Sequence, residues 1–305
     1  MARVSYTLES LANAKPGELS EHLERGSIVY FPRCPFNLPS VEDLEFLRRE
    51  MPGRLARKNV SYHHESGILS GARGSSTIAA RVAEILRGHN ARVKDFLGRV
   101  IPRLAPNWEP ATSSFRPLEE KGRGLASHAS NELLHIDAGA YGATHGDRIL
   151  RFFVNINPEQ DRVWASKGTF AELFPKHAAE AGFAEARTSL SPSLPEKIYS
   201  AAVHALARAI PTSRLLDTSP YDRAMRRFHN FMKDSILFQQ SRDGYVEFSF
   251  PPYSAWMVFT DMTSHACLEG RFALVDTFIV PLTNCRFREL APMGILESVG
   301  SPPRP

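Results

Sequence analysis

A histidine and an aspartate two residues apart form the most informative pair in the sequence. His135 and Asp137 flank Ile136, directly after the apolar residues Leu133 and Leu134. Alternate residues of a strand point to the same side, so both side chains could bind one ion while Ile136 packs on the opposite face. Together with a distant histidine, this pattern is the facial triad of non-haem iron(II) oxygenases, which leaves coordination positions open on one side of the metal.

His265 is the histidine that we expect to complete the triad, because it lies between two segments of strand composition, 255–260 and 272–280. His229 is the alternative, but it lies in an expected helix among Arg226, Arg227 and Lys233, which is typical of a surface histidine. A third group, His63-His64-Glu65, has the composition of a metal site but lies in a loop-rich region. We interpret that group as structural.

A second His-x-Asp pair has to be weighed against the first. With 11 histidines, a chain of this composition contains roughly one such pair by chance, and this one contains two. The second, His145-Gly146-Asp147, follows Gly142 and Thr144, which predicts a turn. A turn would not aim both side chains at one ion, so His135 and Asp137 are preferred.

An arginine on an apolar strand would suit an oxygenase that uses 2-oxoglutarate, because the far carboxylate of this cosubstrate needs a cation. The segment 148–157 reads RILRFFVNIN, and alternation places Arg151 and Asn155 on one face. We therefore favour Arg151, with Asn155 beside it, as the cosubstrate site. Arg148 and Arg271 are the alternatives, and a salt bridge at a strand edge is the ordinary role of such residues.

The elements that must position these residues can be predicted from periodicity and from turn residues. Ser40 and Ser75 or Ser76 are expected to begin two helices, the second with a possible break near Gly88. Strands are expected at 28–31, 133–136, 149–156, 245–250, 255–260 and 272–280. Helices are expected at 196–210 and 221–240, and a disordered end at 301–305. Both late helices belong to a helical insertion at about 170–240.

The order of these elements predicts an α+β protein. Strands do not alternate with helices, so a doubly wound parallel sheet is not expected. We predict a double-stranded β-helix, that is, a cupin-like jelly roll with flanking helices, forming one catalytic domain. Its parts would be N-terminal elements at 1–110 that pack on the barrel, the oxygenase core at 111–290 and a tail at 291–305. The sequence has no Gly-rich phosphate loop, nucleophile elbow or His-Glu-x-x-His motif.

Composition restricts the compartment and the partners. The 305 residues carry a formal charge of +4, without a run of basic residues or a basic stripe interleaved with aromatics, so nucleic acid is not an expected partner. Three cysteines at unrelated spacings fit neither a disulfide framework nor a zinc site. The first thirty residues lack a basic segment followed by a continuous apolar one, so we expect no leader peptide, and no segment is apolar enough to span a bilayer. We expect a protein of the reducing cytoplasm, soluble or peripheral to a membrane.

Four segments resemble one family of 2-oxoglutarate oxygenases, the hydroxylases of 3-deoxy-D-manno-oct-2-ulosonic acid (Kdo). They are SSFRP at 113–117, LHID at 134–137, GDRILRFFVNINP at 146–158 and SHACLEGRFAL at 264–274. The resemblance implies Fe(II) bound by His135, Asp137 and His265, with 2-oxoglutarate and O2 as cosubstrates and ascorbate as an aid in vitro. It also implies hydroxylation of the Kdo 3-position in Kdo-bearing lipid A, at the cytoplasmic face of the inner membrane.

Kdo carries a carboxylate, so cations are expected at the mouth of the barrel. Arg116 and Arg123 precede the metal-bearing segment and are our substrate-binding candidates, although both could be ordinary solvated charges. Three alternatives stay open: an oxygenase of the same fold that acts on a protein, one that acts on another small anionic substrate, and a jelly-roll module that binds an anionic glycan without iron. Oligomeric state cannot be predicted from the sequence.

Overall fold

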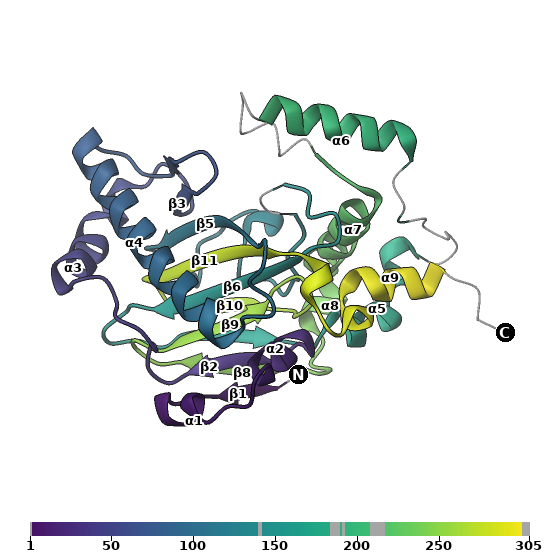
Figure 1. Ribbon diagram of the computed structural model, residues 1–305, viewed down its shortest axis with the longest axis horizontal. Coiled ribbons are helices and arrows are strands. Elements are labelled where there is room, and N and C mark those ends of the chain that lie inside the picture. Colours follow the sequence, from purple (N-terminus) through teal and green to yellow (C-terminus); the bar gives the residue numbers. More distant parts are fainter. Residues whose placement is uncertain (1, 140–141, 184–189, 191–192, 208–216, 301–305) are drawn as a thin grey trace.

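Two facing β-sheets form the centre of the fold (Figure 1). The computed structural model describes the chain apart from residues 1, 140–141, 184–189, 191–192, 208–216 and 301–305. The larger sheet has eight strands in the order β1-β2-β9-β6-β11-β5-β3-β4, and the smaller has the order β10-β7-β8. The strands are β1 (Arg3–Ser5), β2 (Ile28–Phe31), β3 (Val60–His63), β4 (Ile68–Ser70), β5 (Glu109–Arg116), β6 (Arg148–Asn155), β7 (Arg162–Ser166), β8 (Val246–Phe250), β9 (Ala255–Phe259), β10 (Ala266–Glu269) and β11 (Ala273–Val280).

The space between the sheets is filled largely by aromatic side chains. Phe153 of β6 and Trp256 of β9 stack in parallel with ring centroids 5.1 Å apart. Trp164 of β7 packs edge-on against both rings from the smaller sheet. Side chains of β6 alternate between this interior and the opposite face, where Phe152 contacts Phe31 and Phe96. Both faces of β6 are therefore covered, and all eight of its residues are buried.

Helices pack on the larger sheet and gather at one end of the paired sheets (Figure 1). They are α1 (Leu8–Ala12), α2 (Glu18–Glu24), α3 (Val41–Glu50), α4 (Ser76–Val100), α5 (Phe170–His177), α6 (Leu194–Ala207), α7 (Pro220–Asp234), α8 (Ile236–Gln240) and α9 (Pro292–Gly300). Ser40 caps α3 and Ser75 caps α4, in agreement with the sequence prediction. Helix α4 continues through Gly88 without the break that the sequence left open, because apolar residues keep its helical periodicity on both sides.

The helical insertion lies between β7 and β8, as predicted. The expected helix 221–240 is two helices, because Ser235 leaves the helical conformation and caps α8 with its side chain. Helix α6 ends at Ala207 in the described residues, so the predicted stretch 208–210 lies outside them. Helix α7 begins with a capping box between Ser219 and Asp222.

The two ends of the chain contribute strands and a helix to the fold. Strands β1 to β4 do not only pack on the barrel but extend the larger sheet at both edges. Residues 292–300, expected in a tail, form helix α9, and Leu296 of this helix is buried in the core. The predicted disordered end at 301–305 lies outside the described residues. None of the described helices is both long and apolar enough to span a membrane.

Candidate active site

Residues 133–137, called the metal-ligand segment from here on, follow an irregular path beside the smaller sheet. His135 and His265 face each other in an isolated antiparallel bridge, with His135 N donating to His265 O at 3.0 Å and His265 N donating to His135 O at 2.8 Å. Two residues on, Asp137 N donates to Thr260 O at 2.8 Å. These backbone bonds place the two segments of the triad side by side although they are far apart in the sequence.

The expected strand at 133–136 does not form, which corrects the sequence prediction. The polar backbone groups of Leu134 are bonded to a side chain and not to a neighbouring strand: Leu134 N donates to Gln239 Oε1 at 3.0 Å, and Gln239 Nε2 donates to Leu134 O at 2.9 Å. The alternation that motivated the prediction is nevertheless present. His135 and Asp137 point to one side, while Ile136 is fully buried in the core on the other.

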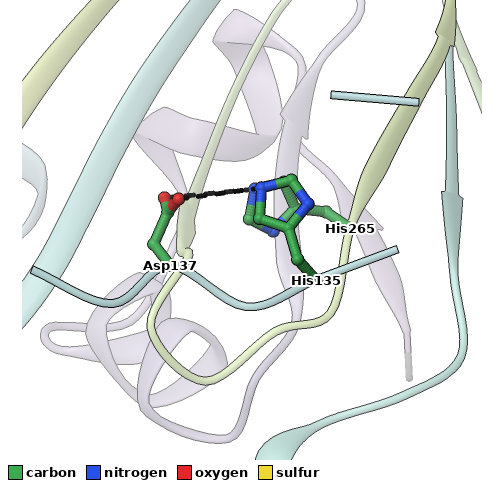
Figure 2. Close-up of side chains that lie close together, drawn as sticks. All are labelled: His135, Asp137 and His265. Atoms are coloured by element: carbon green, nitrogen blue, oxygen red, sulfur yellow. Dashed lines mark ion pairs between the residues drawn. The ribbon is translucent and has the colours of Figure 1, made fainter. Parts of the chain in front are cut away.

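The three predicted ligands converge on one point. Among the described residues, His135, Asp137 and His265 are the group whose ligand atoms all lie within 4.8 Å of one another. The Asp137 carboxylate lies 3.9 Å from His135 Nε2 and 4.0 Å from His265 Nε2. Figure 2 shows the two imidazole rings one in front of the other, with Asp137 across from them. All three side chains are buried, so the site is shielded from bulk water.

Hydrogen bonds determine which nitrogen atom of each imidazole faces the site. His135 Nδ1 donates to Leu133 O at 2.7 Å, and His265 Nδ1 donates to Thr263 O at 2.9 Å. A carbonyl oxygen only accepts, so both Nδ1 atoms carry the proton and both Nε2 atoms present a lone pair. Burial lowers the pKa of His265 to about 4 and the pKa of His135 well below its usual value. Both rings are neutral at neutral pH, as metal ligands must be.

Arg151 lies where the sequence placed it, on the inner face of β6, and it contacts a metal ligand. Its cross-strand neighbours are Val258 and Thr277, and its Nη2 lies 3.0 Å from Asp137 Oδ2. Burial works to raise the pKa of Asp137, but the Arg151 guanidinium and the two histidines hold that pKa well below the usual range. The carboxylate is therefore ionised and available to a cation.

Arg116 shares this interior, which the sequence did not indicate. Its position at the end of β5 was expected to be at the mouth, yet the side chain is 9% exposed and its guanidinium lies 5.7 Å from the ring centre of Phe153. Arg162, fully buried, donates to Glu120 Oε1 at 3.3 Å. Burial, followed by the charge of Arg116, lowers the pKa of Lys58 to about 7. The barrel interior is thus rich in cations.

Three residues that were predicted to bind cosubstrate or substrate form ion pairs or hydrogen bonds with other residues of the protein. Arg148 points to the opposite face of β6, where Nε lies 2.6 Å from Asp261 Oδ2. The Asn155 amide donates to the carbonyl oxygens of Gln160 and Phe250. Arg123 lies 3.5 Å from Glu120 and donates to Lys58 O. Arg148 and Asn155 are thus engaged by other groups of the protein, and the alternative Arg271 is exposed with its guanidinium over Phe272.

The other histidines that were weighed as metal ligands, His145, His63 and His64, form hydrogen bonds outside the triad. His145 and Asp147 are in a turn, as predicted, and bind Asp217 Oδ2 and Leu282 N respectively. His63 belongs to strand β3 and not to a loop, and it bonds to Ser70 Oγ at 3.0 Å. His64 bonds to Ser113 Oγ at 2.8 Å, so this histidine pair is structural.

His229 is not a surface histidine, which corrects the sequence interpretation. Its Nδ1 donates to Ile136 O at 2.5 Å, and its ring lies edge-on to His135 with centroids 5.2 Å apart. Trp164, also missed, stacks on His265 at 5.2 Å. The available signal for His229 was its spacing, since it lies four residues after Met225 and three before Met232, both on the buried face of α7.

Solved structures of one enzyme resemble this chain over almost its full length. The apo structure of the Kdo hydroxylase KdoO, a non-haem Fe(II), α-ketoglutarate-dependent dioxygenase, is 27% identical with a TM-score of 0.78, and the match covers 98% of this chain and 96% of that one. The complex of KdoO with α-ketoglutarate and Fe(III) is 29% identical with a TM-score of 0.79 and the same coverage. The complex with succinate and Fe(III) is 28% identical with a TM-score of 0.77, covering 97% and 95%.

These relatives confirm the predicted jelly-roll fold, the enzyme class and the cofactors Fe(II) and 2-oxoglutarate. No curated protein matches the chain. The sequence matches the family described as 3-deoxy-D-manno-oct-2-ulosonic acid (Kdo) hydroxylase over residues 8–302. Because this match includes both segments that carry the metal ligands and nearly all the rest of the protein, the chain belongs to the Kdo hydroxylase family.

Proposed function

We propose that this protein hydroxylates the 3-position of Kdo in Kdo-bearing lipid A, with Fe(II), 2-oxoglutarate and O2. The observation that carries the proposal is the buried triad of His135, Asp137 and His265 beside Arg151, in a member of this family. Bound iron would supply the oxidation, coupled to conversion of 2-oxoglutarate to succinate and CO2. The chain's own residues hold the ligands, bind the anions and exclude water.

The triad suits a divalent cation for reasons that do not depend on the family. Two neutral imidazoles present Nε2 and one ionised carboxylate completes a set of three donors, as in facial-triad iron sites. Burial of these side chains keeps both imidazoles neutral, and the Arg151 guanidinium keeps Asp137 ionised. His135, Asp137 and His265 are therefore the residues that would hold Fe(II).

The two interior arginines are our candidates for the far carboxylate of 2-oxoglutarate. Arg151 is the first candidate, and its contact with Asp137 places it beside the metal. Arg116 is the second, because its burial removes it from the mouth, where a substrate role had been expected. Both guanidinium groups lower the pKa of His265, so both lie close enough to influence the metal site. We propose that the carboxylate lies between them.

Arg226 of α7 is a candidate for the carboxylate of the sugar, in addition to the predicted Arg123. A Cβ on Gly139 would lie 3.9 Å from Arg226 Nη2, so this exposed guanidinium borders the segment that follows Asp137. Arg123 is the weaker candidate, because Glu120 and a backbone carbonyl already engage its guanidinium. Arg226→Ala should then raise the KM for the Kdo substrate more than the KM for 2-oxoglutarate.

We further propose that the protein acts at the cytoplasmic face of the inner membrane as a peripheral protein. A lipid-linked sugar requires access to a membrane surface, and a formal charge of +4 favours anionic headgroups. The three cysteines are free thiols, in keeping with a reducing compartment.

The decisive experiment measures succinate formation by protein loaded anaerobically with Fe(II), with ascorbate present, in the presence and absence of Kdo-lipid A. We expect turnover that depends on the lipid and a product heavier than the substrate by one oxygen atom. Equal turnover without it, or faster turnover with a peptide or another small anion, would reject Kdo as the substrate. A glycan-binding module without catalysis would bind the lipid but show no iron dependence, and Asp137→Ala supplies that comparison.

A further inference from the structure

Helix α6 exposes an unusually apolar face. Leu194 and Ile198 are 72% and 62% exposed, and Tyr199 and Leu206 are 48% and 46% exposed. At 100° per residue, Leu194, Ile198 and Leu206 lie along one stripe, with the exposed Ala202 between them. Large apolar side chains in a continuous stripe on the surface indicate a binding surface, whereas single exposed ones do not.

The opposite side of α6 is attached to the rest of the protein. Glu196 forms an ion pair with Arg223 of α7, and Ser200 Oγ donates to Asp217 Oδ2 at 3.2 Å. Val203, on the same side of the helix, is buried. These contacts hold the polar side of α6 against the protein, so the apolar stripe points away from it. Figure 1 shows α6 standing outside the body formed by the sheets and the other helices.

The exposed charges of α6 and of α7, the helix that α6 is attached to, are mainly positive. The exposed charged residues of α6 and α7, in the part of these helices that the structure describes, are the cations Lys197, Arg223, Arg226 and Arg227 and the single carboxylate Asp234. A second copy of this chain would present the same cations and be repelled. An anionic lipid surface provides both an apolar layer and opposite charge.

We infer that α6 is the membrane-docking surface of this protein, with its apolar stripe lying in the interface of a bilayer that contains anionic lipids. The helix is about 21 Å long at 1.5 Å per residue, which suits a helix lying in the membrane plane and is too short to cross it. This inference rests on the proposed function, because a lipid-linked sugar gives the enzyme a reason to dock.

The docking surface is coupled to the active site through α7. Near its start α7 binds α6 through Arg223, and further along His229 donates to Ile136 O in the metal-ligand segment. Lys233 of the same helix donates to Ser130 O, just before that segment. Docking through α6 would therefore hold α7 and the metal-ligand segment close to the headgroups.

Vesicle flotation tests the inference without any turnover. We expect the protein to float with vesicles of phosphatidylcholine and phosphatidylglycerol at 7:3, and much less with phosphatidylcholine alone. The double variant Ile198→Ser, Leu206→Ser should reduce partitioning by about tenfold or more, because two large apolar side chains are lost from the interface. Val41→Ser is the matched control: this residue is 73% exposed on α3, and its replacement should change nothing.

A fluorescent variant gives a second readout. Trp108, Trp164 and Trp256 are all buried, so Ile198→Trp adds a solvent-exposed indole whose emission should shift to the blue on vesicles with phosphatidylglycerol. No flotation of the wild type with these vesicles, or full flotation of the double variant, would overturn the inference. Self-association that Ile198→Ser abolishes, without vesicle binding, would assign the stripe to a second copy instead. Flotation without turnover of detergent-dispersed Kdo-lipid A would reject the proposed function and leave the docking surface standing.

Discussion

Two backbone carbonyl groups orient the metal-binding histidines before any metal arrives. Each carbonyl belongs to the residue two positions earlier, Leu133 for His135 and Thr263 for His265, and each accepts the Nδ1 proton. The Nε2 lone pairs are therefore directed at the site by local hydrogen bonds. Preorientation of this kind lowers the cost of metal binding, since neither ring has to change tautomer or rotate.

Each residue of the triad should be indispensable for turnover. We predict that His135→Ala, Asp137→Ala and His265→Ala each leave a folded protein that loses turnover by more than about a hundredfold, because each removes one of three protein ligands. Succinate formation and bound iron after gel filtration check the loss of turnover and its cause, and circular dichroism checks that each variant is folded. His145→Ala and His63→Ala are the controls and should retain most of the activity. Full activity of His265→Ala would reject the triad.

The interior arginines should control the affinity for 2-oxoglutarate. A charge-assisted hydrogen bond is worth about 1.5 to 3 kcal/mol, so Arg151→Met and Arg116→Met should each raise the KM for 2-oxoglutarate about ten- to a hundredfold. Arg151→Met should also weaken iron binding, since Arg151 contacts Asp137, whereas Arg116→Met should not. Steady-state kinetics and iron titration separate the two effects.

Arg148→Met provides the contrast for these variants. It should lower stability, because it leaves Asp261 buried without its ion pair, and should leave the KM for 2-oxoglutarate unchanged in the protein that folds. If Arg116→Met and Arg151→Met both leave this KM unchanged, the far carboxylate binds elsewhere.

The smaller elements around the site show what the sequence could and could not predict. The triad was predictable because His135 and Asp137 are two residues apart and His265 lies between two recognisable strands. The contacts of Gln239 and His229 with the metal-ligand segment were not predictable, because each joins residues about a hundred positions apart in the sequence. A short apolar segment such as 133–136 has the composition of a strand whether its backbone groups bond to a strand or to a side chain.

The Gln239 side chain makes the backbone hydrogen bonds that a neighbouring strand would otherwise make to the metal-ligand segment. Replacing Gln239 should therefore lower the stability of the protein. Its side chain bonds to both backbone groups of Leu134 and to Met232 O. We predict that Gln239→Met lowers the free energy of unfolding by about 1 to 3 kcal/mol, because these buried groups lose their partner. Iron affinity should also fall, since His135 is the next residue. Urea unfolding and iron titration measure the two effects, and the exposed neighbour Gln240→Met is the control.

A buried polar cluster joins α4 to the larger sheet and contains two groups whose pKa values differ between the folded and the unfolded protein. Asp276 of β11 accepts hydrogen bonds from Ser113 at 2.5 Å and Asn90 at 2.8 Å, and its Oδ2 lies 3.3 Å from His89 Nε2. Burial raises the pKa of Asp276 from 3.8 to about 7 and lowers the pKa of His89 from 6.5 to about 3. The folded protein therefore favours a protonated Asp276 and a neutral His89.

The direction in which Asp276 changes the stability with pH follows from its raised pKa in the folded protein. A carboxyl group with a raised pKa in the folded state contributes stability at low pH, and this contribution is lost as pH rises from about 4 to about 7. The lowered pKa of His89 acts with the opposite sign between about pH 3 and pH 6.5, so the contribution of Asp276 is measured by comparing a variant with the wild type at each pH. Asp276→Asn removes the loss, because an amide does not ionise. We predict that this variant gains stability relative to the wild type between pH 5 and pH 8, as urea unfolding would measure. Asp95→Asn, on the exposed side of α4, should show no such trend, and parallel profiles for Asp276→Asn would contradict the assignment.

At the level of the whole molecule, the strands at 149–156, 245–250, 255–260 and 272–280 and the helical insertion could be predicted from periodicity, whereas the contributions of the termini could not. Strands β1 and β4 are three residues each, too short to give a periodic signal, yet they form the edges of the larger sheet. Residues 292–300 have few features of a long helix, and their helical conformation depends on packing such as that of Leu296 against the core. Elements that exist because of tertiary contacts cannot be found by local pattern alone.

Ligand binding should stabilise the whole fold, because the site is built into the space between the two sheets. Without ligands this interior holds Arg116, Arg151 and Arg162 against the carboxylates of Asp137 and Glu120, so positive charge is in excess. A divalent cation satisfies Asp137 and the histidines, and the two carboxylates of 2-oxoglutarate compensate the arginines. A ligand at a hundred times its Kd adds about 2.7 kcal/mol to the free energy of unfolding.

For a chain of 305 residues, that stabilisation corresponds to a rise in Tm of about 4 °C. With cobalt(II) as a redox-stable probe, we predict a rise in Tm with the metal and a further rise when 2-oxoglutarate is added, both followed by differential scanning calorimetry. Asp137→Ala should lose the first rise, and Arg116→Met should keep the first and lose most of the second. A metal-induced rise of equal size in Asp137→Ala would mean that the stabilising ion binds outside the triad, and the coupling between this site and the fold would then be absent.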